Sequence, residues 1–134
     1  MDSVILTLMR KQYYFRPSSG GLLAWDVDRL VDLSKHLPRK TIRLADVREL
    51  DEPWCGDDER PTWRAMVEHM KLIDDADLSF PIILSSAGAV MDGRHRIAKA
   101  LWQGRTEVEA VQFDEDPPPD HVGVGPNDLP YGEE

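Results

Sequence analysis

The sequence predicts a small α/β domain of the α+β type, with a small mixed sheet and about three helices. Its 134 residues suit one domain, which we expect to span residues 1–113, followed by a tail over residues 114–134. Two segments, 27–37 and 63–73, repeat apolar residues at helical spacing. Residues 81–113 read as strand, turn, strand, helix and strand. These three observations together favour a mixed α and β architecture.

The first third of the chain predicts two strands and one helix. Val4 to Met9 forms an apolar run that suits a strand, and a break follows at residues 17–21. The next segment has one apolar helical face, formed by Val27, Leu30, Val31, Ser34 and Leu37. Pro38 stops that helix. Residues 41–44 alternate apolar and polar side chains, which predicts a short strand.

A charged, irregular stretch from Arg48 to Arg60 separates this strand from a second helix. The stretch contains Trp54 and Cys55 together with six acidic residues. The helix that follows Pro61 carries an apolar stripe that we expect to be core, formed by Trp63, Met66, Val67, Met70 and Ile73.

The last third predicts a hairpin, a helix and a strand. Residues 81–84 and 89–91 are short apolar strands around the turn 85–88. Residues 95–103 suit a helix, and Gly104 lies where a C-terminal capping glycine belongs. Residues 107–113 suit a strand. The proline-rich remainder is a tail or an extended arm that wraps around the body, and we expect the domain to fold without it.

The charge distribution argues against autonomous nucleic-acid binding. The formal net charge is −9, and residues 114–134 hold seven acids and no Lys or Arg, which leaves −2 for residues 1–113. Proteins that bind nucleic acid on their own normally present a basic surface. No apolar run suits a signal peptide or a membrane span, and the single cysteine permits no internal disulfide. We therefore expect a soluble, cytoplasmic protein.

The candidate site is the segment Asp92-Gly93-Arg94-His95-Arg96 at the start of the last helix. A helix N-terminus carries partial positive charge, so a cation there costs about 0.3–1 kcal/mol. Three basic side chains at that end are favourable if an anion lies among them and also accepts the free backbone N–H groups. Gly93 allows a close backbone approach and an unusual φ angle. Asp92, at the end of a strand, could orient a metal ion or an attacking hydroxyl.

A purely structural interpretation of the same residues exists. Asp92 could cap the helix, and Arg94 or Arg96 could pair with acids from the stretch 48–60. His95 could be a hydrogen-bonded structural histidine. For Lys99, one turn further on, the structural interpretation is the stronger one.

Residues 81–113 resemble the ParB/sulfiredoxin superfamily, and the resemblance extends in weaker form from residue 41. The shared pattern is an apolar strand, a turn, a strand that ends in Asp92-Gly93, then Arg94-His95-Arg96 and a helix closed by Gly104. The superfamily includes the nucleotide-binding domain of ParB, sulfiredoxins and free serine kinases. The resemblance implies that a nucleotide phosphate contacts Gly93, His95 and Arg96, and Arg94 with them. It also implies that Asp92 matches the aspartate that lies at the reacting phosphate in the kinases.

The chain departs from each branch of the superfamily. Sulfiredoxins carry their catalytic cysteine at the position of Arg94, whereas Cys55 lies in a different segment. ParB proteins continue into a helix-turn-helix domain, and here an acidic tail follows instead. The kinases have a further acidic residue upstream, for which the candidates are Glu49, Glu52, Asp57, Asp58 and Glu59.

Two functions follow as hypotheses. The first is an enzyme that binds ATP, ADP or CTP with Mg²⁺ and acts as a kinase-like phosphotransferase or nucleotide hydrolase, with Asp92 and His95 as catalytic residues and Asp92 as the Mg²⁺ ligand. The second is a non-catalytic, nucleotide-responsive module that contacts a protein partner through its acidic tail. A DNA-associated accessory protein or nuclease is a weaker third alternative, because the charge balance argues against it.

Overall fold

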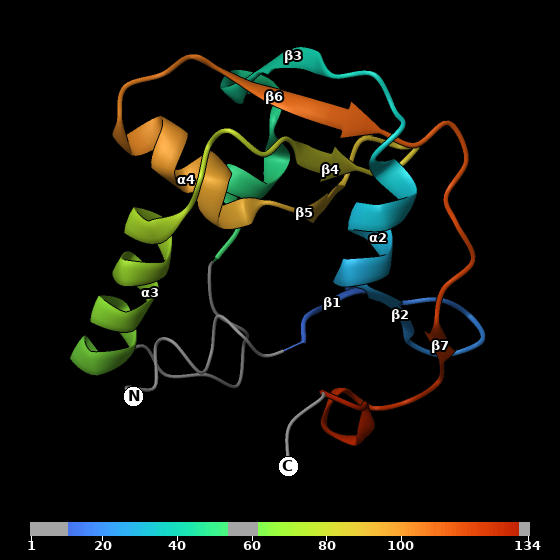
Figure 1. Cartoon of the computed structure of the whole chain (residues 1–134). Helices are drawn as coiled ribbons and strands as arrows, with labels where there is room; N and C mark the ends of the chain where they lie inside the picture. Colours follow the sequence, from blue (N-terminus) through green and yellow to red (C-terminus); the bar gives the residue numbers. More distant parts are fainter. Residues whose placement is uncertain (1–10, 54–61, 132–134) are drawn as a thin grey trace.

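The computed structural model describes residues 11–53 and 62–131, and within them two sheets form the framework (Figure 1). The first sheet has the order β1-β2-β7, from Tyr13–Arg16, Leu23–Asp26 and His121–Val122, and is antiparallel. The second has the order β3-β6-β4-β5, from Lys40–Arg43, Glu107–Gln112, Ile82–Leu84 and Val90–Asp92. It is mixed, because β6 is parallel to β4 while the other two pairs are antiparallel. The predicted mixed sheet is the second one.

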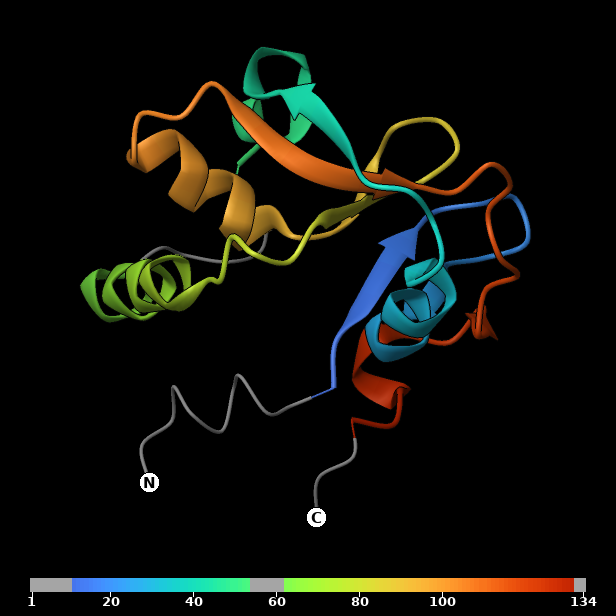
Figure 2. The same cartoon turned by 45° about the horizontal axis from the view of Figure 1, so that its top comes forward.

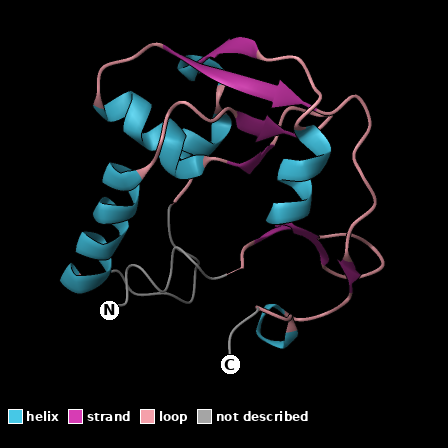
Figure 3. Ribbon diagram, in the orientation of Figure 1, coloured by secondary structure: helices cyan, strands magenta, loops and turns pink. Residues whose placement is uncertain are grey.

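Three α-helices lie in the described part of the chain: α2 (Val27–Ser34), α3 (Trp63–Asp75) and α4 (Arg94–Trp102) (Figure 3). Short 3-10 turns cover Leu44–Asp46, Arg48–Asp51 and Pro126–Asp128. The protein is thus a small α+β domain, as the sequence predicts.

The helices α2 and α3 begin at side-chain caps. The carboxylate of Asp26 accepts a hydrogen bond from the backbone N–H of Asp28 at 2.9 Å, and the hydroxyl of Thr62 accepts one from Ala65 at 3.0 Å. Helix α2 ends at Ser34, three residues before Leu37, the last apolar position of the predicted face, and Leu37 precedes Pro38, where helical conformation is disfavoured.

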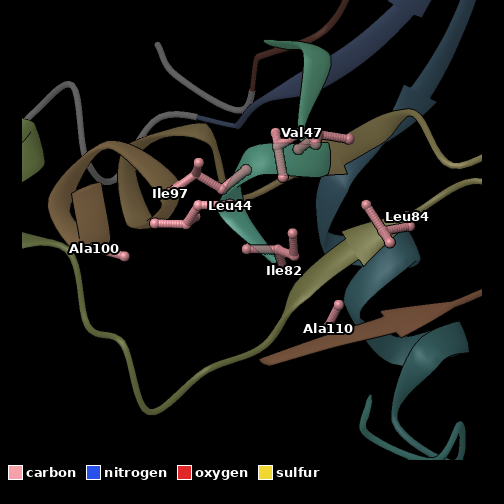
Figure 4. Packing of buried hydrophobic residues seen from close by; sticks show 8 residues of the cluster. Leu44, Val47, Ile82, Leu84, Ile97, Ala100 and Ala110 are labelled. Carbon is pink, nitrogen blue, oxygen red and sulfur yellow. The ribbon is translucent and has the colours of Figure 1, made fainter. Parts of the chain in front are cut away.

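In the second sheet, β4 is buried and so are Val90 and Met91 of β5, which explains their continuous apolar runs, whereas β3 and the start of β6 are exposed. Helix α4 covers one face, and helix α2 with the first sheet covers the other (Figures 1 and 2). Figure 4 shows the cluster on the α4 side, which consists of Leu44, Val47, Ile82, Leu84, Val90, Ile97, Ala100 and Ala110. The cluster on the other side consists of Trp25, Leu30, Ile83, Met91, Val111 and Phe113.

The predicted hairpin and the helix that follows it are confirmed. Strands β4 and β5 pair around a turn in which the N–H of Ser85 donates to Ala89 O at 2.8 Å. Gly104 follows α4 with a φ of +78°, as expected of a glycine that ends a helix. This unit delivers Asp92 and Gly93 to the start of α4.

The segment after β6 is an arm that crosses the first sheet. Its strand β7 pairs with β2, and Leu129 is buried with 5% of its surface exposed. The indole N–H of Trp25 donates to Pro117 O at 2.8 Å, and the N–H of Asp26 donates to the Asp120 carboxylate at 2.8 Å.

The predicted core stripe of the second helix is wrong. Trp63 is 83% exposed, and Met66, Val67 and Met70 are also exposed, whereas only Ile73 is partly buried. Helix α3 packs on α4 through a different face, which includes Ala65 and His69. Helical spacing shows that a stripe exists but does not show which stripe meets the body.

Other expectations have different outcomes. The first sheet was not predicted, because its strands have two to four residues and no clear alternation. The expected strand Val4–Met9, and Trp54 and Cys55, lie outside the described residues. In the described part of the chain, no helix is long and apolar enough to cross a membrane.

Candidate functional site

Gly93 is the residue that joins strand β5 to helix α4. Its φ is +114°, a conformation that side-chain-bearing residues rarely adopt. A Cβ atom built on Gly93 would lie 2.6 Å from Ile82 Cγ2. Both the backbone angle and the close approach to β4 therefore require glycine here.

Helix α4 begins without the kind of cap that α2 and α3 have. Among the described residues, no side chain caps its N-terminus, and its first turn contains no acidic residue. The helical hydrogen bonds begin with the N–H of Ile97, which donates to Gly93 O at 3.0 Å. The N–H groups of Arg94, His95 and Arg96 therefore precede the helical ladder and are suited to an anion.

These residues line a cavity of about 280 Å³, which we call the turn cavity. One wall is the segment from Met91 to Arg96. The opposite wall is the C-terminal end of α3 and the residues after it, with Leu72, Asp75, Ala76 and Asp77. Cations and backbone N–H groups thus face carboxylates across one small space.

Arg96 and Asp92 form an ion pair at the edge of this cavity. Arg96 Nη2 donates to Asp92 Oδ2 at 2.7 Å, and the two side chains are 18% and 19% exposed. The Nε atom of Arg96 is buried and has no hydrogen-bond partner in the described part of the chain. Because Nε is shielded from solvent, a ligand in the cavity could reach this guanidinium only through its Nη groups.

His95 packs edge to face against His69 of α3. Their ring centroids are 5.1 Å apart and their planes meet at 65°. Burial lowers the pKa of His95 below its usual value, the neighbouring His69 and Arg96 lower it further, and Asp92 opposes them. Burial also lowers the pKa of His69. His95 is therefore neutral at pH 7 and can both donate and accept a hydrogen bond.

Arg94 extends to the opposite side of the turn, where it meets the acidic stretch. Its guanidinium lies 3.5 Å from the Glu52 carboxylate, and both side chains are more than half exposed. Glu49 has a structural role, because its carboxylate accepts from the N–H of Val90 at 2.9 Å. Of the upstream acidic candidates, Glu52 is thus the one that reaches the turn within the described residues, while Asp57, Asp58 and Glu59 lie outside them.

The carboxylates suit a Mg²⁺ ion only if a ligand supplies further oxygens. The described residues contain no group of three or more His, Cys, Asp or Glu side chains placed to hold a metal ion. Asp92 is already paired with Arg96, and Asp77 accepts from the N–H of Ser79 at 2.9 Å, a bond that lowers its pKa. Mg²⁺ usually binds through one or two carboxylates together with substrate phosphates, and Asp92 with Asp75 or Asp77 fits that smaller donor set.

The structure brings together all five residues of the predicted segment, and it adds three that sequence reasoning missed. His69, Asp75 and Asp77 come from α3 and the residues after it, so that only tertiary packing brings them to the turn. Lys99 is structural, because its ammonium donates to Asp74 O at 2.6 Å and to Ala76 O at 2.9 Å, where it caps the end of α3.

Comparisons of this chain with protein-family models, with curated proteins and with solved structures give no significant match.

Proposed function

We propose that this domain binds the phosphate of a nucleotide at the N-terminus of α4. The observation that carries the proposal is the uncapped first turn of α4, in which three basic residues follow a left-handed glycine and line a cavity. Arg94 and Arg96 are cations, and each costs about 0.3–1 kcal/mol at a positive helix end, whereas His95 is neutral. An anion in the turn cavity would attract these cations and offset that cost. It would also accept hydrogen bonds from the free backbone N–H groups.

Each residue of the turn has a role in this proposal. Gly93 allows the phosphate to approach the backbone. Arg96 donates charge-assisted hydrogen bonds from its guanidinium, which are stronger than neutral ones. Neutral His95 donates one further hydrogen bond. Arg94 is exposed, so solvent screens its charge. Its contribution is therefore a weak electrostatic attraction for the anion.

The resemblance of residues 81–113 to the ParB/sulfiredoxin superfamily supports a nucleotide, with ATP, ADP and CTP as candidates. In the enzymatic version, the protein transfers or hydrolyses a phosphoryl group, and Arg96, His95 and the helix N-terminus stabilise charge on that group. Asp92 would hold Mg²⁺, which supplies charge neutralisation at the phosphates when bound, or would orient the attacking hydroxyl.

The second candidate function is a nucleotide-responsive interaction module. The ion pair between Asp92 and Arg96 favours it, because both groups that an enzyme would use are engaged with each other at 2.7 Å. A phosphate that takes Arg96 would release Asp92 and could change the neighbouring surface. The acidic arm would then offer a contact for a protein partner.

A thermal-shift screen with nucleotides and inorganic phosphate, with and without Mg²⁺, tests the shared claim. A ligand at 100 times its Kd stabilises the fold by about 2.7 kcal/mol, which raises Tm by several degrees for a domain of this size. If neither nucleotides nor phosphate nor sulfate shift Tm, phosphate binding is wrong.

Phosphate release by the best binder separates the two functions. For an enzyme, Asp92→Asn abolishes turnover with Mg²⁺ and binds nucleotide at least as tightly as the parent without Mg²⁺, because a carboxylate beside the phosphate repels it. Tight binding without any turnover favours the interaction module.

A further inference from the structure

A second cavity of about 280 Å³ lies beside the turn cavity, and Asp92 and Arg96 line both. It is bounded by helix α2 on one side and by strands of the second sheet on the other, and we call it the α2 cavity. Its apolar wall consists of Val31, Leu37, Phe80, Pro81, Ile83 and Val111. The two cavities thus meet at a shared ion pair.

The two cavities differ in chemistry. The turn cavity has backbone N–H groups, basic side chains and carboxylates, whereas the α2 cavity has an apolar wall with an exposed aromatic ring, Phe80. Ligand pockets are mostly apolar with a few placed polar groups, and they usually measure roughly 300–1,000 Å³. Each cavity, at about 280 Å³, lies near the lower end of that range.

We propose that the α2 cavity holds the base of the nucleotide whose phosphate occupies the turn cavity, with Phe80 as its stacking partner. The inference rests on the proposed phosphate binding and adds the place of the base. Phe80 is 58% exposed and lines the α2 cavity, so much of its side chain is accessible to a ligand. Aromatic rings bind bases by stacking, whatever the base.

The polar groups at this cavity can contact the edge of a base. Ser34 is buried, and its hydroxyl donates to Val31 O at 3.1 Å, which leaves the oxygen as an acceptor. Arg39 is held at the rim by Glu109 at 2.9 Å and by Ser79 O at 3.1 Å. The cavity therefore presents Ser34 as an acceptor and Arg39 as a fixed donor beside an apolar wall, and Lys35 and the Asp92–Arg96 pair also line it.

Two neighbouring cavities are less suited to a base. One, of about 310 Å³, lies on the other side of Phe80 and shares only Arg96 with the turn, and it carries the carboxylates of Glu107 and Glu109. The other, of about 260 Å³, shares Arg94 and His95 with the turn, but its wall has no Phe, Tyr or Trp ring among the described residues. The cavity of about 310 Å³ is also lined by Phe80 and Arg96, but of these three cavities only the α2 cavity shares both Asp92 and Arg96 with the turn cavity.

The test compares a nucleotide with ligands that lack the base, by calorimetry on the full chain. We expect a nucleoside monophosphate to bind about ten- to a hundredfold more tightly than ribose 5-phosphate or inorganic phosphate, which is the range that base stacking supplies. Val31→Trp fills the α2 cavity and should remove this preference while inorganic phosphate binds as before. Phe80→Ala should weaken the nucleotide in the same selective way.

Matched variants decide where the base lies. Val67→Trp replaces an exposed valine on α3 and should leave the preference unchanged. Ala98→Trp fills the cavity beside His95 instead. If Ala98→Trp removes the preference and Val31→Trp does not, the α2 cavity is not the base site, although phosphate binding stands. Equal affinity for nucleotide and inorganic phosphate overturns the inference about the base but leaves the proposed phosphate binding intact. Failure of every phosphate to bind overturns it together with the proposed function.

Discussion

At the scale of the single residue, Gly93 shows how one position serves both the fold and the site. Its left-handed backbone turns the chain from β5 into α4, and its missing side chain lets β4 pack against that turn. The same features expose the N–H groups of the first helical turn. A substitution here should therefore affect stability and phosphate binding together.

A glycine-to-alanine substitution ordinarily changes the free energy of unfolding by about 1 kcal/mol or less. Gly93→Ala should destabilise the fold by more than that, because it adds a steric clash to backbone strain. Gly88→Ala is the matched control, since Gly88 has a φ of +91° but nothing within 4 Å of a Cβ atom. Chemical denaturation of both variants isolates the clash with Ile82. Equal losses of unfolding free energy in both variants would contradict this account.

The ion pair of Asp92 and Arg96 changes the expected effect of removing Arg96 on the stability of the fold. Viewed as a cation at a positive helix end, Arg96 could be removed without harm to the fold. In the structure, its removal would leave the carboxylate of Asp92, which is only 19% exposed, without its partner. Helical spacing does not predict this pair, because Asp92 belongs to β5 and the left-handed Gly93 separates it from α4.

A double-mutant cycle with Asp92→Asn and Arg96→Met should give a coupling energy of about 0.5–3 kcal/mol, because each single variant leaves one partly buried charge unpaired. The control cycle uses the exposed pair of Arg43 and Asp46, at 3.2 Å, where solvent screening should reduce the coupling to about 0–1 kcal/mol. Urea denaturation measures both cycles. Similar coupling in the two cycles would mean that the Asp92–Arg96 pair acts as a surface pair.

His95 should make stability depend on pH. Its pKa is lowered in the folded state, so the unfolded chain takes up a proton first as pH falls. The stabilising effect is therefore complete above the unfolded pKa of about 6.5 and is lost as pH falls from there toward the lower folded pKa. The loss ends once pH lies below that folded pKa.

We expect Tm to fall between about pH 7.5 and about pH 5.5, and we expect His95→Gln to make that fall smaller. His36→Gln, at an exposed position, is the control and should retain the parental slope. Bound phosphate should oppose the loss, because an anion favours protonated His95. An unchanged slope in His95→Gln would show that the buried imidazole is not the cause.

Much of the candidate site could be predicted from the sequence because its five residues are consecutive. Their spacing, the glycine and the unusual basic first turn need no tertiary information. His69, Asp75 and Asp77 could not be predicted, since they reach the turn only through the packing of α3 on α4. The assignment of Glu52 to Arg94 likewise depends on where the loop after β3 lies.

At the scale of the element, α3 carries two apolar faces, and only one of them meets the body. The partly buried face combines the apolar Ala65 and Leu72 with His69, whereas the exposed stripe has more of the large apolar residues. Hydrophobicity alone therefore favours the wrong face. In α4 the same reasoning succeeds in part, because Ile97 and Ala100 are buried against β4 and β6 whereas Leu101 and Trp102 are exposed.

Val67→Glu on the exposed stripe of α3 should change the unfolding free energy by no more than about 0.5 kcal/mol. Ile97→Ala, in the core cluster, should cost about 2–5 kcal/mol. Chemical denaturation compares the two variants. A loss of several kcal/mol in Val67→Glu would show that the stripe is covered in the folded protein.

At the scale of the whole molecule, the sequence predicts the second sheet but not the first. The hairpin, helix and strand of residues 81–113 lie close in sequence, so local patterns predict them. The first sheet joins β2 to a strand almost one hundred residues later, and Leu23 is paired with Val122. No local sequence pattern predicts the pairing of β2 with β7.

The arm is expected to matter more for stability than its composition suggests. Removal of residues 114–134 would uncover Trp25, take away β7, which is one of the two partner strands of β2, and break the ion pair of Arg29 with Asp120 at 3.0 Å. We therefore expect a large loss of Tm on truncation, although the polar composition alone suggests a dispensable tail.

Leu129→Ala tests the same point with a milder change and should cost about 2–5 kcal/mol, because Leu129 is buried. Val122→Ala, at a position that is 55% exposed in the same arm, should cost clearly less. Thermal unfolding measures both. A truncated protein with the parental Tm would show that the arm adds nothing to the body.

The pairing of β2 with β7 also sets an order of events during synthesis. All strands of the second sheet have been translated by residue 112, whereas β2 must wait for residues 121 and 122 before its second edge is covered. Until then, the nascent chain presents an open strand edge beside an uncovered Trp25, the kind of surface that invites pairing with another chain. A ribosome that pauses before residue 121 would prolong that exposure, and chaperone binding to stalled nascent chains should be strongest in this interval.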